Sequence, residues 1–238
     1  MRARALSAAQ LDQPGLDTVD VGAGTGFATE GVIEHVDAAR VTMLDQSAAQ
    51  LRRAQAKPAL AACRKLLGDA EDLPFPDDAF DRYVSCGSIE YWPDPERAIR
   101  EAHRVLRPGG LAMVAGPLPP SGRVARWLAD AWMLFPSRAD YVRWFEAAGF
   151  ADVRVLTVAA PWAASAGGGA YAVAVAGRAT RSGAPAPSWS EAVPERADEP
   201  WTVRRLVRFA AGSLAGALFI PVGIFMKLRV RRAAGRSP

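Results

Sequence analysis

Three glycines and an aspartate near the amino end have the types and spacing of a ligand-binding turn. The stretch reads T-V-D-V-G-A-G-T-G, and its acid and glycines are Asp20, Gly22, Gly24 and Gly26. Valines before the glycines favour a short strand, and residues 27–36 predict a helix. Such a turn presents backbone N–H groups and a helix N-terminus to a ligand. The pattern indicates a nucleotide-type site, although any strand–helix turn can carry glycines.

The spacing of the glycines distinguishes two kinds of nucleotide site. A dinucleotide site has G-x-G-x-x-G, but the position of its third glycine is Phe27 in this chain. The G-x-G-x-G pattern, with an acid two residues ahead, resembles motif I of the S-adenosylmethionine-dependent methyltransferases. The resemblance implies that the glycines admit the methionine part of that cofactor and that Asp20 lies near its ammonium group.

Acidic residues also follow the next two expected strands. Asp45 ends the apolar run 41–44, and Asp69 follows Leu66 and Leu67. The carboxyl ends of parallel strands meet at one edge of a sheet, where ligands bind. There Asp45 can accept both hydroxyls of a ribose, and Asp69 can accept the amino group of an adenine. Asp45 could also cap the helix that follows it, and the two roles are compatible.

The remaining pattern predicts an α/β fold with a mostly parallel, doubly wound sheet. The expected further elements are a strand at 80–85, a helix at 96–106, a strand at 111–115, helical sequence within 123–145, and a closing pair of strands at 153–158 and 170–176. The helical stretch 123–145 is rich in aromatic residues, which either fill the core or form an apolar wall for a lipid-like acceptor.

Several segments stand in an order typical of one methyltransferase family. They are D-V-G-A-G-T-G, L-D-Q-S, G-D-A-E-D-L-P-F-P, G-S-I-E-Y-W-P-D-P, V-L-R-P-G-G and D-A-W-M-L-F-P. From about residue 16 to residue 158 the chain closely resembles the plastid 2-methyl-6-phytyl-1,4-benzoquinol / 2-methyl-6-solanesyl-1,4-benzoquinol methyltransferases. The resemblance implies a Rossmann-like class I fold, S-adenosyl-L-methionine as cofactor, and methylation of a prenylated benzoquinol ring in tocopherol and plastoquinone biosynthesis.

The resemblance also implies roles for individual residues. Cofactor contacts are expected from Asp20, Gly22, Gly24, Gly26, Asp45, Gln46, Asp69, Ala70 and Ser85. Residues 85–91 are expected to border the methyl group and the acceptor ring. Methylation of a ring carbon needs alignment of the reactants, and a base near a ring hydroxyl would help. Glu90 and Tyr91 are the candidate catalytic residues, with ordinary packing under a loop as the alternative for Tyr91.

Two departures from the family keep other functions open. The first 16 residues are expected to be too short for a helical cap and to supply neither a transit peptide nor the family's N-terminal segment. Residues 163–170 read A-A-S-A-G-G-G-A, where family members carry arginine and histidine. The alternatives are therefore a methyltransferase for another lipid-soluble quinol or phenol, and a truncated, non-catalytic relict attached to a membrane.

The sequence divides into three expected parts. They are a methyltransferase domain at 1–177, a flexible linker at 178–203 and a membrane anchor at 204–238. The anchor contains the uncharged run from Phe209 to Met226, which is near the lower length limit of a membrane-spanning helix and has basic flanks. The resemblance implies the chloroplast inner envelope membrane as the location.

Composition excludes some classes of partner and site. The net charge of +4 is too modest to require a nucleic acid. Cys63 and Cys86 lack the spacing of a metal site and favour a reduced compartment, and two histidines rule out a multi-histidine metal centre. The sequence sets no oligomeric state.

Overall fold

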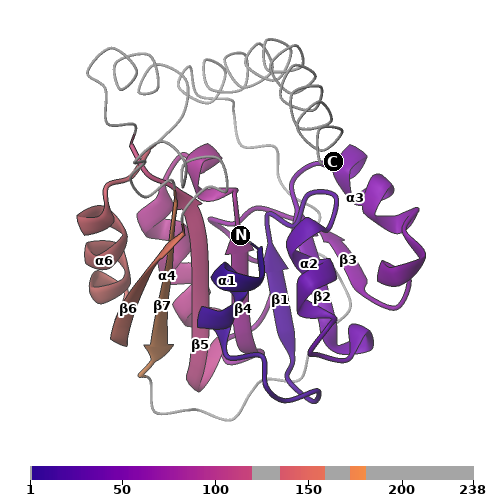
Figure 1. Ribbon diagram of the computed structural model, residues 1–238, viewed down its shortest axis with the longest axis horizontal. Coiled ribbons are helices and arrows are strands. Elements are labelled where there is room, and N and C mark those ends of the chain that lie inside the picture. The colour runs from indigo at the N-terminus through magenta and orange to yellow at the C-terminus, as the bar shows by residue number, and fades with distance from the viewer. Residues whose placement is uncertain (1, 120–134, 159–171, 181–238) are drawn as a thin grey trace, which may run out of the picture.

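The computed structural model describes residues 2–119, 135–158 and 172–180 (Figure 1). The described strands form one seven-stranded sheet with the order β3-β2-β1-β4-β5-β7-β6. Their bounds are β1 Thr18–Val21, β2 Val41–Asp45, β3 Arg64–Leu67, β4 Phe80–Cys86, β5 Leu106–Pro117, β6 Phe150–Val158 and β7 Ala172–Ala179. The first five strands pair in parallel, and β7 runs antiparallel to both β5 and β6. This arrangement confirms the expected mostly parallel sheet and its closing pair of strands, which the structure shows to be antiparallel.

Helices cover both faces of the sheet (Figure 1). All four residues of the central strand β1 are buried. The helices are α1 Arg2–Leu6, α2 Phe27–Val32, α3 Ala48–Gln55, α4 Pro95–Val105 and α6 Arg138–Ala147, with single helical turns η1 Ser7–Ala9, η2 Ala38–Arg40, η3 Pro58–Leu60 and η4 Ile89–Tyr91. One core contains side chains of α4 and α6, and the other contains side chains of α1, α2 and α3. Tyr83 and Val84, adjacent in β4, enter opposite cores because successive strand residues face opposite sides.

The amino-terminal segment differs from the expectation that it is too short for a helical cap. Residues of α1 and η1 pack onto the sheet, and Leu6 is buried. Gly31 of α2 makes this packing possible, because the Cδ1 atom of Leu6 lies only 2.5 Å from where a Cβ on Gly31 would be. Arg2 then pairs with Glu34 at 2.7 Å and lies over the Phe27 ring at 5.2 Å. A helix this short is stabilised by tertiary burial rather than by its own propensity, which is why the sequence pattern missed it.

Other boundaries differ by a few residues. The helix after the glycine turn ends at Val32 rather than at position 36, and β5 begins at Leu106, so that it includes the R-P-G-G run expected only to stop the preceding helix. Helix α4 begins at Pro95, one residue before the expected start at position 96, and the Asp94 side chain caps it by accepting a hydrogen bond from the Arg97 N–H at 3.0 Å.

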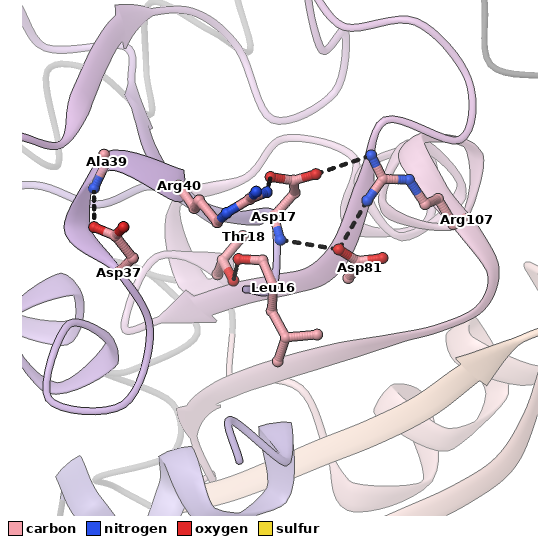
Figure 2. A network of polar contacts seen from close by, with 8 residues as sticks. All are labelled: Leu16, Asp17, Thr18, Asp37, Ala39, Arg40, Asp81 and Arg107. Carbon is pink, nitrogen blue, oxygen red and sulfur yellow. Dashed lines mark hydrogen bonds and ion pairs between the residues drawn. The ribbon is translucent and has the colours of Figure 1, made fainter. Parts of the chain in front are cut away.

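Four charged residues tie the amino ends of β1 and β4 to neighbouring elements, as Figure 2 shows. Arg107 lies 3.0 Å from the Asp17 carboxylate and 2.8 Å from that of Asp81, while Arg40 lies 2.8 Å from the other oxygen of Asp17. The Asp81 carboxylate also accepts the Asp17 backbone N–H at 2.9 Å. This network fixes the edge of the sheet opposite to the glycine turn.

Replacing Arg107 with methionine is expected to lower the free energy of unfolding by about 1 kcal/mol, since it removes two ion pairs that are each about one-third exposed to solvent and therefore screened. Urea unfolding should be measured at low salt and at about 0.5 M NaCl, where charges a few ångströms apart are screened. The loss of unfolding free energy caused by R107M should be smaller at the higher salt concentration. Arg100, whose ion pair is the exposed one with Glu96, is the control, and R100M should cost about 0.5 kcal/mol or less. A salt-independent loss in R107M would show that packing, not charge, is responsible.

Candidate active site

The glycine turn after β1 is folded tightly against the end of β2. Gly22, Gly24 and Gly26 all have positive φ angles, of 70°, 56° and 84°. The N–H groups of Gly22 and Ala23 both donate to the Leu44 carbonyl, at 2.8 and 3.1 Å. A Cβ atom at Gly22 would collide with Ser88, and one at Gly26 with Leu60, but one at Gly24 would meet no protein atom within 4 Å. The first and third glycines therefore allow close packing, and Gly24 faces open space.

Asp45 joins this turn to the start of α3. One carboxylate oxygen accepts the Gly24 N–H at 2.7 Å, and the other accepts the Ser47 N–H at 2.8 Å. The N-cap of α3 is Ser47, whose side chain accepts from Gln50, so Asp45 is not itself the cap. Each carboxylate oxygen has further lone pairs, which leaves Asp45 able to accept additional hydrogen bonds.

A cavity of about 270 Å³ lies at the carboxyl ends of β1, β2, β3 and β4. Residues expected from the sequence to belong to the site line it: Gly22, Gly24, Asp45, Gln46, Asp69, Ala70 and Tyr91. Asp20, Gly26, Ser85 and Glu90 are not among its lining residues. The lining also includes Gly87 and Ser88, which belong to the range 85–91 that was expected to border the acceptor, and residues that the sequence reasoning did not single out: Leu44, Ser47, Gln50, Gly68, Trp92 and Pro93. Most of them lie within a few residues of a strand end or a motif residue, and that position is the signal that could have found them.

Ser85 acts behind the cavity wall. It is fully buried at the end of β4, and its hydroxyl lies 2.6 Å from that of Ser88. Ser88 lines the cavity and packs against the Gly22 backbone. Ser85 thus positions the loop after β4 against the glycine turn.

Asp20 is a buried carboxylate beneath the turn. It has no exposed surface, and one of its oxygens accepts the Thr29 hydroxyl at 2.6 Å. Its other oxygen has no hydrogen-bond partner among the described residues. Burial raises the pKa of Asp20 to about 6, assisted by the nearby charge of Asp45 and opposed by the Thr29 hydrogen bond. A cationic group nearby would favour its ionised form.

Between pH 4 and pH 6 the folded protein keeps a proton on Asp20 that the unfolded chain loses. The Asp20 contribution to stability is therefore expected to fall by up to roughly 3 kcal/mol as the pH rises through this window. Asparagine does not titrate, so Asp20→Asn should lack this pH dependence. The unfolding free energy of wild type should therefore fall relative to that of D20N between pH 4 and pH 7. Chemical unfolding at pH 4, 5, 6 and 7 measures it, with D37N as an exposed control; a constant difference would contradict the raised pKa.

The two candidate catalytic residues point in different directions. Tyr91 is half exposed and lines the cavity, whereas Glu90 is partly buried and does not line it. The Oε2 atom of Glu90 has no hydrogen-bond partner within the described part of the chain, and burial raises the pKa of Glu90 to about 7. The single turn η4 therefore presents one of the pair to the cavity and holds the other behind it.

Several other expectations have a clear structural outcome. His103 is buried against Phe150, with ring centroids 4.9 Å apart. In the aromatic stretch, Tyr141, Trp144 and Phe145 belong to the core. Residues 163–170, most of the expected linker and the run from Phe209 to Met226 lie outside the described residues. Within the described ranges, no helix has the length and apolar character needed to cross a membrane.

The donor set fits a nucleoside cofactor with a positively charged end. The cavity offers carboxylates at Asp45 and Asp69, together with a glycine that leaves room for a ligand at Gly24. The buried, unpartnered oxygen of Asp20 lies below the same turn. Hydroxyl-rich and cationic groups are the ligands that such carboxylates bind well.

Comparisons with known proteins give the family. Residues 19–114 match the family model described as "Methyltransferase domain". The chain is 54% identical over 162 residues to 2-methyl-6-phytyl-1,4-hydroquinone methyltransferase 1, chloroplastic, of Oryza sativa subsp. japonica, covering 68% of this chain and 49% of that protein. It is 46% identical over 234 residues to the corresponding chloroplastic enzyme of Spinacia oleracea, covering 96% of this chain and 67% of that protein.

A solved structure shares the fold. The crystal structure of an S-adenosylmethionine-dependent methyltransferase from Mesorhizobium loti superposes with a TM-score of 0.62 and 24% identity, covering 73% of this chain and 95% of that one. Together these relationships place the chain in the family of 2-methyl-6-phytyl-1,4-hydroquinone methyltransferases, whose methyltransferase domain and Rossmann-like class I fold imply S-adenosylmethionine as the cofactor.

Proposed function

We propose that this protein methylates a ring carbon of a prenylated hydroquinone, of the 2-methyl-6-phytyl- or 2-methyl-6-solanesyl-1,4-benzoquinol type, in tocopherol and plastoquinone biosynthesis. The main support is 46% identity to the spinach enzyme across 96% of this chain. The chain spans about half the length of the rice relative and two-thirds of the spinach relative. The activity is therefore proposed from the similarity to these relatives together with the residues of the cavity.

Each part of the cavity has a proposed cofactor contact. Asp45, with Gln46 beside it, takes the ribose hydroxyls, because its carboxylate is fixed by two backbone N–H groups and retains lone pairs. Asp69 and Ala70 flank the adenine. The turn of Gly22, Gly24 and Gly26 holds the methionine end, with Asp20 beneath it as the counter-charge to the ammonium group. Ser85 contributes indirectly, through Ser88.

S-adenosylmethionine supplies a methyl group on a positively charged sulfur, which is already a strong electrophile. The protein's task is then to align a ring carbon with that methyl group and to exclude water. Methyl transfer would leave S-adenosylhomocysteine and a ring-methylated hydroquinone, with the proton of the ring carbon released to water. Tyr91 borders the acceptor at the cavity, and Glu90 accepts a hydrogen bond or proton from a ring hydroxyl, which increases electron density on the ring.

The test is an assay of the full chain with S-adenosylmethionine and 2-methyl-6-phytyl-1,4-hydroquinone under anaerobic conditions. Mass spectrometry should show a product heavier by one methyl group that is attached to ring carbon rather than to oxygen. Transfer to oxygen, or only to other phenols, would support the alternative acceptor. Tight binding of the cofactor without transfer to any quinol would overturn the proposal and favour the non-catalytic alternative.

The membrane location is a further part of the proposal. The uncharged run from Phe209 to Met226, with basic residues on both sides, would hold the protein at the chloroplast inner envelope, where a prenylated quinol dissolves. The rice and spinach relatives are named as chloroplastic. Flotation with liposomes containing anionic lipid should carry the full chain upward, and Leu218→Asp within the run should reduce this. Equal flotation of wild type and L218D would contradict the anchor.

A further inference from the structure

Two buried oxygen atoms beside the cofactor cavity have no partner in the described protein. They are the Oε2 atom of Glu90, in η4, and the hydroxyl of Tyr141, in α6. Tyr141 is fully buried. A buried polar atom without a hydrogen bond is unfavourable by about 1–3 kcal/mol, so a protein that retains two such atoms in one region requires a reason.

The two side chains converge on the same place in the fold. A Cβ atom on Gly116, near the carboxyl end of β5, would collide with the Tyr141 hydroxyl and would lie 2.6 Å from Ile89, the residue before Glu90. The negative charge of Glu90 contributes, after burial, to a pKa of Tyr141 that is well above its usual range. The Tyr141 hydroxyl and Ile89 of η4 therefore both lie against Gly116, which leaves the room that the hydroxyl occupies.

This region adjoins the cofactor cavity. Gly87 lines the cavity, and a Cβ atom at Gly87 would be 3.9 Å from the Oε1 atom of Glu90. The Glu90 carboxyl thus lies close to Gly87 in the cavity wall, and the turn η4 that carries it also contributes Ile89 beside the Tyr141 hydroxyl. Neither Glu90 nor Tyr141 lines the cavity itself, so the pair is not explained by cofactor binding.

We propose that the Glu90 carboxyl and the Tyr141 hydroxyl together bind one ring hydroxyl of the hydroquinone acceptor. This inference rests on the proposed function. A phenolic hydroxyl both donates and accepts a hydrogen bond, so it can donate to Glu90 and accept from Tyr141, satisfying both oxygens at once. The apolar side chain of Ile89, which lies beside the same place, suits a neutral aromatic ring. Since both oxygens are covered in this structure, binding requires a local opening beside η4.

Tyr141 would then bind the acceptor in addition to packing in the core, and a conservative variant distinguishes these two roles. Tyr141→Phe removes only the hydroxyl and leaves the ring packing. If the hydroxyl only packed, the substitution would remove an unpartnered polar group and nothing else. Y141F should therefore be at least as stable as wild type while binding the acceptor less tightly, a combination that a merely structural role does not give.

The experiment is calorimetric titration of the full chain, loaded with S-adenosylhomocysteine (the demethylated product form of the cofactor), under anaerobic conditions. The probe is 2-methyl-6-geranyl-1,4-hydroquinone, and its 1,4-dimethyl ether is the matched ligand without hydroxyl donors. The protein variants are Y141F, E90Q and the control Y83F. Tyr83 is also fully buried with an unpartnered hydroxyl among the described residues, but it lies in the middle of β4.

Y141F and E90Q should each weaken binding of the hydroquinone by about tenfold, with the affinity for S-adenosylhomocysteine unchanged. Y83F should bind as wild type does, and the dimethyl ether should bind wild type, Y141F and E90Q equally weakly. Equal affinity of Y141F and wild type for the hydroquinone, or no preference of wild type for the hydroquinone over its ether, would overturn the inference.

The same samples separate this inference from the proposed function. If wild type shows the hydroxyl-dependent binding but never methylates the hydroquinone, the proposed function fails and the binding pair stands. If wild type methylates the hydroquinone and Y141F does so with an unchanged KM, the function stands and the inference fails. Absence of any hydroquinone binding by wild type would also overturn the inference.

Discussion

Asp45→Ala is expected to weaken binding of S-adenosylmethionine by at least about 100-fold. The substitution removes the proposed acceptors of the ribose hydroxyls, and hydrogen bonds to a charged carboxylate contribute about 1.5–3 kcal/mol each. It also removes the bonds from Gly24 and Ser47 that hold the turn and the start of α3 together. Two such losses account for a factor of 100 or more. Calorimetry on the full chain measures the effect.

A matched control exists in the same protein. Asp37 also accepts a backbone N–H at a helical turn, from Ala39 at 3.0 Å, but it lies at the opposite edge of the sheet (Figure 2). D37A should leave cofactor binding unchanged. D45N keeps one acceptor oxygen but places an amide group against a backbone donor. Its affinity for S-adenosylmethionine should therefore lie between those of wild type and D45A. A dissociation constant for D45A within threefold of wild type would remove Asp45 from the cofactor site.

The second large effect concerns two glycines of the same turn. Substitution of one should weaken cofactor binding, and substitution of the other should destabilise the fold. Gly24→Ala places a methyl group into open space on the cavity wall, so the protein should still fold, at a cost of about 1–2 kcal/mol for the left-handed backbone. Cofactor binding should nevertheless weaken by about tenfold or more, because the added group occupies the ligand's approach to the backbone.

Gly22→Ala should instead destabilise the fold. Its Cβ atom would collide with Ser88, and its backbone is also left-handed, which together predict a loss of about 2–4 kcal/mol. Urea unfolding and cofactor titration of both variants test the pair. A G24A protein that binds the cofactor like wild type would show that the ligand does not approach this part of the turn.

The sequence alone determined the order of elements and the edge of the sheet that holds the site. Alternating apolar strands and amphipathic helices require a mostly parallel sheet, and parallel strands bring their carboxyl ends together. Asp45, Gln46, Asp69 and Ala70 each follow such a strand end, so their meeting around one cavity could be predicted from position. Gly22 and Gly24 lie there for the same reason.

Only the tertiary structure decided which way individual side chains point. Glu90 and Tyr91 are neighbours in sequence, yet Tyr91 lines the cavity and Glu90 does not. The same helical turn places Ile89 beside the hydroxyl of Tyr141, which comes fifty-one positions after Glu90 in the chain. Similarly, the five residues of α1 fold because Gly31 leaves room for Leu6. Periodicity describes one element at a time, whereas these outcomes depend on the space that another element leaves, which no local pattern encodes.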